Sequence, residues 1–197
     1  MPPYDNPEIQ PNEDVYRLGQ YGYQMKDRIY LARFYYRASR NLEETKLLIE
    51  ANYHFRSKHP NVFFNRDPDS DSIQQSTEFF HMVTLPGLTT DNSRVTLVKL
   101  KSTDANMMHH IEDVKYLFTF YDYRVSLPDV VENGKPYIVN GVIQIVDMKG
   151  ITMRHAAKTS FTILAAAIKY LQKCCPSTLK GLHLVNCPSY INRLFAW

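Results

Sequence analysis

Two short apolar segments separated by a long helical pattern constrain the fold of this chain more than any other feature. Residues 141–147, GVIQIVD, are almost wholly apolar, and residues 179–185, LKGLHLV, form a second strand-like run. Between them, Met153–Cys175 has the composition and periodicity of a helix. Because parallel strands are joined by crossovers of about this length, the three segments predict a βαβ unit within a parallel sheet.

Segments further upstream extend the same alternation of strands and helices. Arg94–Leu100, RVTLVKL, alternates as a strand does, and Asn106–Val131 carries a long helical pattern. The pair Asn133-Gly134 predicts a turn before the apolar strand. The predicted fold class is therefore α/β, with a mostly parallel sheet that helices cover on both faces.

The amino-terminal part predicts a small all-helical domain in front of the sheet. Asp27–Arg40 keeps its apolar residues on one broad face, which is typical of an amphipathic helix. Asn41 is a favourable N-cap with Glu44 three residues later, and Pro60 ends the second helix. Two such helices form a hairpin that needs another surface to pack against.

An acidic segment follows, NRDPDSDSIQQ at 65–75, and it resembles a calcium-binding loop. The acidic residues at EF-hand spacing are Asp67, Asp69, Asp71 and Glu78. However, Ser72 stands where the sharp turn of that loop requires glycine, and Pro60 interrupts the entering helix. We interpret the segment as a solvated linker. The expected organisation is a loosely ordered lead-in at 1–25, a helical N-terminal domain at 26–64, a linker at 65–79 and an α/β domain at 80–197.

Composition and charge exclude several classes of protein. The net charge of +3 is too small to indicate nucleic-acid binding, and the longest apolar stretch, Phe161–Leu171, is too short to span a membrane. The first residues lack the basic and apolar regions of a secretory signal. Three cysteines, two of them adjacent at Cys174 and Cys175, argue against a disulfide framework. We expect a cytoplasmic protein.

Motifs for catalysis, metals and cofactors are not found in the sequence. The seven histidines form no HExxH, the cysteines form no CxxC, and no GxSxG, GxGxxG or phosphate-binding loop occurs. Asp147 ends a strand, where parallel-sheet enzymes place acids, but it equally suits a cap of the next segment. His183 is interpreted as a core histidine of a buried strand, and His109-His110 as a surface pair. The prediction is no enzyme, no metal and no cofactor, and catalysis by Asp147 with His155 or His183 is kept as an alternative.

The helical segment FTILAAAIKYLQKCC mixes small and large apolar residues. Ala165, Ala166 and Ala167 leave room beside the helix, while Ile163 and Leu171 supply apolar contacts. Such a face either packs closely against the sheet or lines a cavity for an apolar ligand, and the sequence alone favours packing.

Several segments together resemble the CRAL-TRIO family of lipid-binding domains, in the branch similar to alpha-tocopherol transfer protein and retinaldehyde-binding protein. The helical leader DRIYLARFYYRASRNLEETKLLIE resembles the family's amino-terminal helices, and NGVIQIVDMKGITMRHAAK and LKGLHLVNCPSYINRLF resemble its sheet. The residues that fit the family pattern in order are Gly141, Asp147, Gly150, His155, Gly181, His183, Asn186 and Pro188.

The resemblance implies an apolar ligand that is enclosed between the sheet and its helices and carried between membranes. The positions that match the family's pocket are Tyr121, Val142, Met153, Ala167, Tyr170, Leu171, Leu179 and Leu182. Where the tocopherol carrier has two serines after the position of Tyr121, this chain has Arg124 and Pro128. The ligand is therefore expected to be tocopherol-, retinoid- or phospholipid-like, without a closer identity.

The resemblance also implies transient contact with membranes that contain phosphatidylinositol bisphosphate. Lys180 matches one basic position of the family's cleft, but Thr178 stands where the relative has lysine, and the remaining positions would follow Trp197. The family continues with further helices and a gating helix after INRLFAW, so the resemblance implies a chain truncated at its carboxyl end. The alternatives are a phosphoinositide-reading scaffold without cargo and an inactive fragment.

Overall fold

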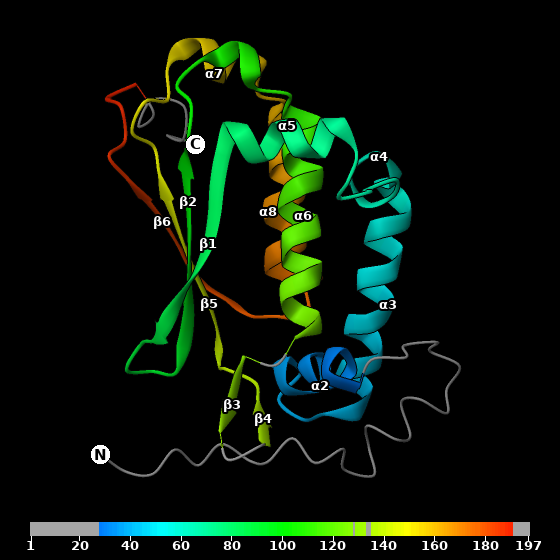
Figure 1. The fold of residues 1–197 in the computed structure, drawn as a ribbon. Coiled ribbons are helices and arrows are strands. Elements are labelled where there is room, and N and C mark those ends of the chain that lie inside the picture. Colours follow the sequence, from blue (N-terminus) through cyan, green and yellow to red (C-terminus); the bar gives the residue numbers. More distant parts are fainter. Residues whose placement is uncertain (1–27, 128, 133–134, 191–197) are drawn as a thin grey trace.

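The computed structural model describes residues 28–127, 129–132 and 135–190 of the chain (Figure 1). Its first described part is helical: α2 (Arg28–Arg37), α3 (Leu42–Lys58), α4 (Pro60–Phe63) and α5 (Asp71–Phe79). The side-chain oxygen of Asn41 accepts a hydrogen bond from the amide of Glu44 at 3.1 Å, which caps α3 as the sequence predicted.

A four-stranded mixed sheet follows. It consists of β1 (Phe80–Leu88), β2 (Ser93–Leu100), β5 (Gly141–Asp147) and β6 (Leu179–Val185), in the order β1-β2-β5-β6. β1 pairs antiparallel with β2, whereas β2, β5 and β6 are parallel neighbours. A separate two-stranded ribbon joins β3 (Val130–Glu132) to β4 (Lys135–Tyr137).

Helices connect the parallel strands. They are the short 3-10 helix η1 (Ala105–Met107), α6 (His110–Ser126), α7 (Met153–Lys158) and α8 (Phe161–Lys173). Figure 1 shows α6 and α8 between the sheet and the amino-terminal helices, so that the molecule has three layers. This arrangement is the mostly parallel α/β fold with a helical amino-terminal region that the sequence predicted.

The amino-terminal helices share a hydrophobic core with α6 and α8. Val62 and Phe63 of α4 pack with Phe118 of α6 and Tyr170 of α8. The rings of Phe63 and Phe118 stack with their centroids 4.5 Å apart. The helical amino-terminal region therefore packs directly on the covering helices of the sheet.

Several element boundaries differ from the sequence expectation. The expected linker at 65–79 contains α5, whose buried residues Ile73, Ser76 and Phe79 recur every third residue, and β1 follows it directly. The expected helix at 106–131 is shorter, because it starts as η1 and ends at Ser126. The expected helix at 153–175 is two helices, because the chain is extended at Thr159 and Ser160, and Ser160 caps α8.

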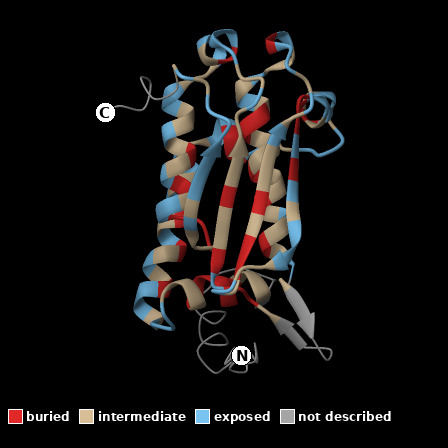
Figure 2. Ribbon diagram, turned by 90° about the vertical axis from the view of Figure 1, so that its left-hand side faces the viewer, coloured by how far each residue is buried: buried red, intermediate tan, exposed pale blue. Residues whose placement is uncertain are grey.

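The interpretation of β6 as a buried strand was wrong. Most of its residues are exposed, including His183, because β6 is the last strand of the sheet. Figure 2 shows the sheet face that lies away from α6 and α8, and no described helix covers it. Coverage by helices is therefore observed on one face of the sheet among the described residues.

The lead-in at 1–25, Pro128 and the turn at Asn133-Gly134 lie outside the described residues. Among the described helices, none is sufficiently long and apolar to cross a lipid bilayer.

Candidate functional site

An apolar pocket lies between the sheet and the two helices that cover it. It has a volume of about 330 Å³, and the surface that its walls present to the cavity is apolar. The sheet contributes Phe80, Val98, Leu100, Gln144, Val146, Leu182 and Leu184, and the helices contribute Val114, Leu117, Tyr121, Leu164, Ala167, Ile168 and Leu171.

Strand register explains why these strand residues share a wall. Val98, Val146 and Leu184 are direct neighbours across β2, β5 and β6, so their side chains point to the same face. Gly141 lets β5 and β6 start close together, because a Cβ there would lie 2.6 Å from the carbonyl oxygen of Thr178. Opposite this wall, the small side chain of Ala167 leaves room for the cavity.

Four of the residues that the resemblance assigned to the ligand line this pocket. Tyr121 lies on α6, Ala167 and Leu171 lie on α8, and Leu182 lies on β6. These positions come from three elements that are far apart in the sequence, and the fold brings them around one cavity.

The other assigned residues lie elsewhere. Tyr170 is buried on the opposite side of α8, where its hydroxyl accepts hydrogen bonds from Asn52 and Arg56 of the amino-terminal helices. Burial raises the pKa of Tyr170 well above its ordinary value. Val142 borders a small void beyond Tyr121, Met153 is mostly exposed at the start of α7, and Leu179 is partly buried at the start of β6.

Gln144 is a pocket residue that the sequence reasoning missed. The buried hydroxyl of Tyr121 donates a hydrogen bond to Oε1 of Gln144, and the Gln144 amide donates to the carbonyl oxygen of Ile145 at 3.3 Å. Burial raises the pKa of Tyr121. The available signal was a single amide in the otherwise apolar run GVIQIV, on the same strand face as Val146.

Asp113 borders the other end of the pocket, at the start of α6. Its carboxylate accepts hydrogen bonds from the hydroxyl of Ser76 at 2.8 Å and from the backbone amide of His109 at 3.0 Å. Burial is the main cause that raises the pKa of Asp113 to about 6. The carboxylate thereby ties α5 to α6 beside the cavity.

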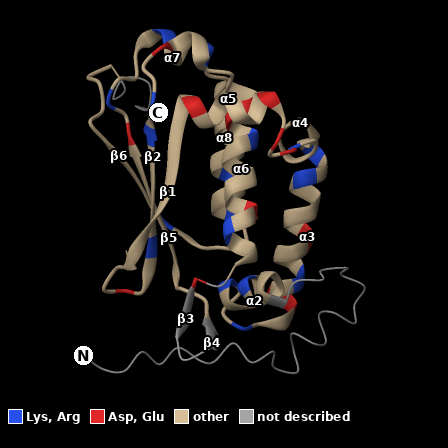
Figure 3. Ribbon diagram, viewed as in Figure 1, with Lys and Arg blue, Asp and Glu red and all other residues tan. Residues whose placement is uncertain are grey.

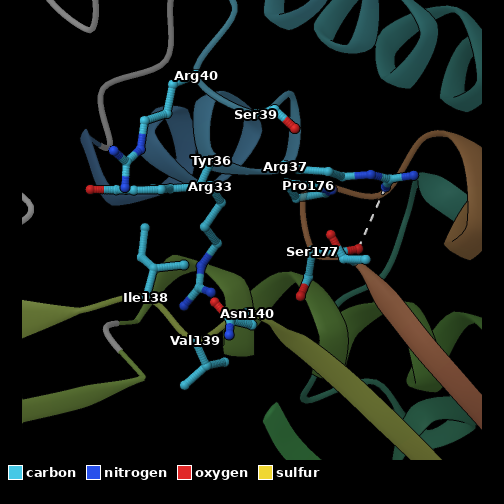
Figure 4. A pocket seen from close by; sticks show the side chains of 11 residues that line it. Arg33, Tyr36, Arg37, Ser39, Arg40, Ile138, Val139, Asn140, Pro176 and Ser177 are labelled. Carbon is cyan, nitrogen blue, oxygen red and sulfur yellow. Dashed lines mark hydrogen bonds between the residues drawn. The ribbon is translucent and has the colours of Figure 1, made fainter. Parts of the chain in front are cut away.

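A second, polar pocket of about 380 Å³ lies at the end of α2 (Figure 4). Arg33, Arg37 and Arg40 line it from the helical side, and Asn140 and residues 176–178 line it from the sheet side. We call it the basic pocket. Figure 3 shows that Lys and Arg residues gather around α2, and Ser39 and Arg40 have positive φ angles of 53° and 64° where the chain turns into α3.

Two of these arginines are engaged in the fold. Arg33 donates to the carboxylate of Asp129 at 2.7 Å and to the carbonyl oxygen of Val125 at 2.7 Å. Arg37 donates to the carbonyl oxygen of Gln172 in the last turn of α8 and to those of Cys175 and Ser177 after it. The guanidinium of Arg40 lies over the ring of Tyr36, 5.5 Å from its centroid.

Lys180, the predicted phosphoinositide contact, lies two residues after Thr178 of the basic pocket and is exposed. The side chain of Lys180 passes close to Gly141, because a Cβ on that glycine would lie 2.8 Å from its Cγ.

Two residues of the enzyme alternative, Asp147 and His155, have structural partners. Asp147 accepts hydrogen bonds from the side-chain amide of Asn186 at 2.8 Å and from the backbone amide of Lys149, and these bonds lower its pKa. His155 is buried, caps α7 by accepting from the amide of Thr152, and stacks on Phe79. Across the described part of the chain, no three His, Cys, Asp or Glu residues are grouped closely enough to hold a metal ion.

Two protein-family models match the chain. The model described as CRAL/TRIO domain matches residues 80–197, which include the sheet and both helices of the apolar pocket. The model described as Pinta-like, UBA domain matches residues 23–73 in the helical leader.

Curated relatives with the name Clavesin match the same chain. Clavesin-1 of Xenopus laevis is 24% identical over 178 residues, which cover 88% of this chain and 50% of that protein. Clavesin-2 of Rattus norvegicus is 35% identical over 71 residues, covering 36% of this chain and 21% of that protein. Clavesin-1 of Mus musculus is 37% identical over 71 residues, covering 36% of this chain and 20% of that protein. The chain spans half or less of the length of these relatives.

Proposed function

The chain belongs to the CRAL/TRIO domain family, and on that basis we propose that it binds an apolar lipid between its sheet and helices α6 and α8. The observation that carries this proposal is the apolar pocket of about 330 Å³ at that place. Each CH₂ group that leaves water for such a cavity stabilises the complex by about 0.8 kcal/mol. The hydrocarbon chain of a lipid is the class of ligand that can contact the whole of this apolar wall.

The proposed mechanism is enclosure without chemical change of the ligand. The cargo is tocopherol-, retinoid- or phospholipid-like, as in the tocopherol and retinaldehyde branch of the family, and no catalytic residue takes part. The protein shields the apolar chain from water while it moves between membranes, and it acts in the cytoplasm with transient membrane contact. Tyr121, Ala167, Leu171 and Leu182 support this proposal because they line one cavity.

Two measurements test the proposal. Mass spectrometry of lipid extracted from the purified chain is expected to find one dominant apolar species near equimolar amount. The variant Ala167→Phe fills the pocket and is expected to lose most of this lipid. Ala165→Phe, an exposed position on the same helix, is the matched control and retains the lipid. Equal lipid content in both variants would exclude the pocket as the binding site.

The basic pocket favours a second function, the binding of a phosphoinositide headgroup at a membrane surface. Arg33 and Arg37 are committed to carboxylate and carbonyl oxygens, so we assign the phosphate contact to Arg40, and propose a second contact from Lys180, two residues after Thr178 of the pocket wall. One basic residue near an anionic membrane contributes about 1 kcal/mol, so binding also needs hydrogen bonds from the pocket wall. Asn140 and Ser177 are polar residues of this wall.

Vesicles with and without phosphatidylinositol bisphosphate test this second function. Arg40→Gln is expected to weaken binding to the phosphoinositide vesicles several-fold, and Lys180→Gln to weaken it further. Arg154→Gln, on α7 at the other end of the molecule, carries the same charge change and is the control. Headgroup-dependent binding without lipid extraction would favour the scaffold alternative over the carrier, and equal effects of Arg40→Gln and Arg154→Gln would reject the basic pocket.

A further inference from the structure

Three arginine side chains from different parts of the fold meet beside the basic pocket. Arg33 comes from α2, Arg94 from β2 and Arg124 from α6, and all three border a void of about 10 Å³. Arg33 is 3% exposed and Arg94 is 6% exposed. Among the described residues that border this void, Asp129 is the one carboxylate, and its side chain is 4% exposed. The walls of the void therefore carry more positive than negative charge, and this charge is buried.

Arg94 is the arginine whose charge the fold compensates least. Arg33 and Arg124 each lie 2.7 Å from the carboxylate of Asp129. The hydrogen bonds of Arg94 within the described residues go instead to backbone carbonyl oxygens, those of residues 85–86 and of Asp129. Its Nε has no hydrogen-bond partner in the described part of the chain. Because a guanidinium is always charged and has five N–H groups, Arg94 keeps donors for a further acceptor.

The uncompensated charge also acts on Arg124. Burial lowers the pKa of Arg124, and the charges of Arg33 and Arg94 lower it further, against the opposite effect of Asp129. A buried charge is costly unless an opposite charge lies beside it. The partial charges of carbonyl oxygens compensate a guanidinium only in part, so this environment favours an anion in the void.

The size of the void decides which anion can enter. About 10 Å³ is the room that one water molecule needs, so a phosphate or a carboxylate group does not fit. A halide ion is only slightly larger than a water molecule, and small shifts of the arginine side chains accommodate it. Arg33 and Ser177 border both the void and the basic pocket, which gives the ion a way in from solvent (Figure 4).

We propose that Arg33, Arg94 and Arg124 hold one chloride ion in this void, and that the ion joins the helical leader to the sheet and to α6. A water molecule fits the same space but leaves the positive charge without compensation. This inference does not depend on the lipid or phosphoinositide binding proposed above, because a halide is the largest ligand that the void holds.

Thermal unfolding of the full chain in chloride and in gluconate tests the proposal. Equal ionic strength keeps the screening of surface charges constant, and gluconate is too large for the void. Because chloride binds the folded chain, we expect the unfolding midpoint to rise by about 3 °C or more as chloride replaces gluconate. Arg94→Met removes the charge and its donors, and is expected to lose most of this rise.

Arg66→Met is the matched control. The side chain of Arg66 is also largely buried, at 14% exposed, and it pairs with Asp122 away from the void. This variant is expected to unfold at a lower temperature and to keep the rise with chloride. A wild-type midpoint that does not respond to chloride, or an equal rise in Arg94→Met, would overturn the chloride site.

Bromide locates the ion directly and does not depend on the folding of a variant. Crystals of the full chain grown with bromide in place of chloride are expected to show an anomalous scattering peak among Arg33, Arg94 and Arg124. A void that holds only water in these crystals would overturn the assignment. A peak confined to the basic pocket near Arg40 would also overturn it, because the anion would then occupy that pocket instead.

Discussion

The carboxyl group of Asp113 keeps its proton to a higher pH in the folded chain than in the unfolded chain. Burial raises its pKa from 3.8 to about 6, so between these values the folded state binds more protons than the unfolded state. Its contribution to the free energy of unfolding is therefore largest in acid and is lost as the pH rises through about 6. As the pH rises from about 4 to about 7, we expect the free energy of unfolding of Asp113→Asn to increase relative to that of the wild type, by at most about 3 kcal/mol.

Urea unfolding of both proteins across this pH range measures the effect as a difference, which cancels the titration of other groups. The asparagine side chain keeps one oxygen that accepts from the hydroxyl of Ser76, but it has no second oxygen for the amide of His109. The loss of this second hydrogen bond does not depend on pH, so it shifts the difference in free energy by a constant amount. A difference that does not change with pH would contradict the raised pKa.

Asp129 is the buried carboxylate that two arginines share. It lies 2.7 Å from Arg33 of α2 and 2.7 Å from Arg124 of α6, and its side chain is 4% exposed. We expect Asp129→Asn to lower the free energy of unfolding by about 3 to 5 kcal/mol, because removal of one partner leaves buried charge without compensation. Glu43→Gln is the control, since its pair with Lys46 is exposed and is worth less than about 1 kcal/mol. Equal unfolding midpoints of the two variants in urea would disprove this role of Asp129.

At the scale of single residues, the sequence predicted part of the candidate site. Family resemblance placed Tyr121, Ala167 and Leu182 at one ligand, and the fold brings them around one cavity. It also assigned Tyr170, but the side chain of Tyr170 points to the amino-terminal helices. A resemblance in sequence places a residue on a helix, but it does not show which side of that helix faces the cavity. Gln144 was missed because its role depends on a partner 23 residues away.

Helix α3 is an element whose start was predicted from local chemistry. Asn41 has an extended backbone, and its side chain satisfies the amide of Glu44, one of the donors that a helix start leaves free. We expect Asn41→Ala to lower the free energy of unfolding by about 1 kcal/mol, and Asn41→Asp to lower it by less because aspartate also caps the helix. Thermal unfolding of the two variants measures this difference, and equal losses would mean that the side-chain cap does not stabilise α3.

Elements that depend on their neighbours were harder to predict. Helix α5 lies in a polar segment, and its apolar residues Ile73 and Phe79 are buried against the rest of the molecule, a contact that the local sequence does not reveal. The break between α7 and α8 has no proline or glycine, and Ser160 at the new helix start was the one local signal. The strands β5 and β6 were predicted from their short apolar runs. The exposure of β6 was not predicted, because it follows from the position of this strand at the edge of the sheet.

At the scale of the whole molecule, side chains from the leader join the amino-terminal helices to the layer formed by α6 and α8. Arg56 of α3 donates to Asp122 of α6 and to the hydroxyl of Tyr170 of α8. Arg37 of α2 donates to the carbonyl oxygen of Gln172, in the last turn of α8, and to that of Cys175 just after the helix. Because these contacts fix the helices that line the apolar pocket, the leader supports the site although none of its described residues, from 28 onward, borders that cavity.

This joining predicts that the leader and the sheet domain unfold together. Phe63 of the leader is 4% exposed, with its ring centroid 4.5 Å from that of Phe118 and 4.8 Å from that of Tyr170. We expect Phe63→Ala to lower the free energy of unfolding by about 3 to 5 kcal/mol through the cavity it leaves. Hydrogen exchange followed by mass spectrometry is expected to show the same loss of protection in peptides from α3 and from β5. Phe64→Ala, at the neighbouring residue that is 53% exposed, is expected to change neither. Faster exchange confined to α3 would mean instead that the leader opens on its own, and that the pocket helices keep their positions without it.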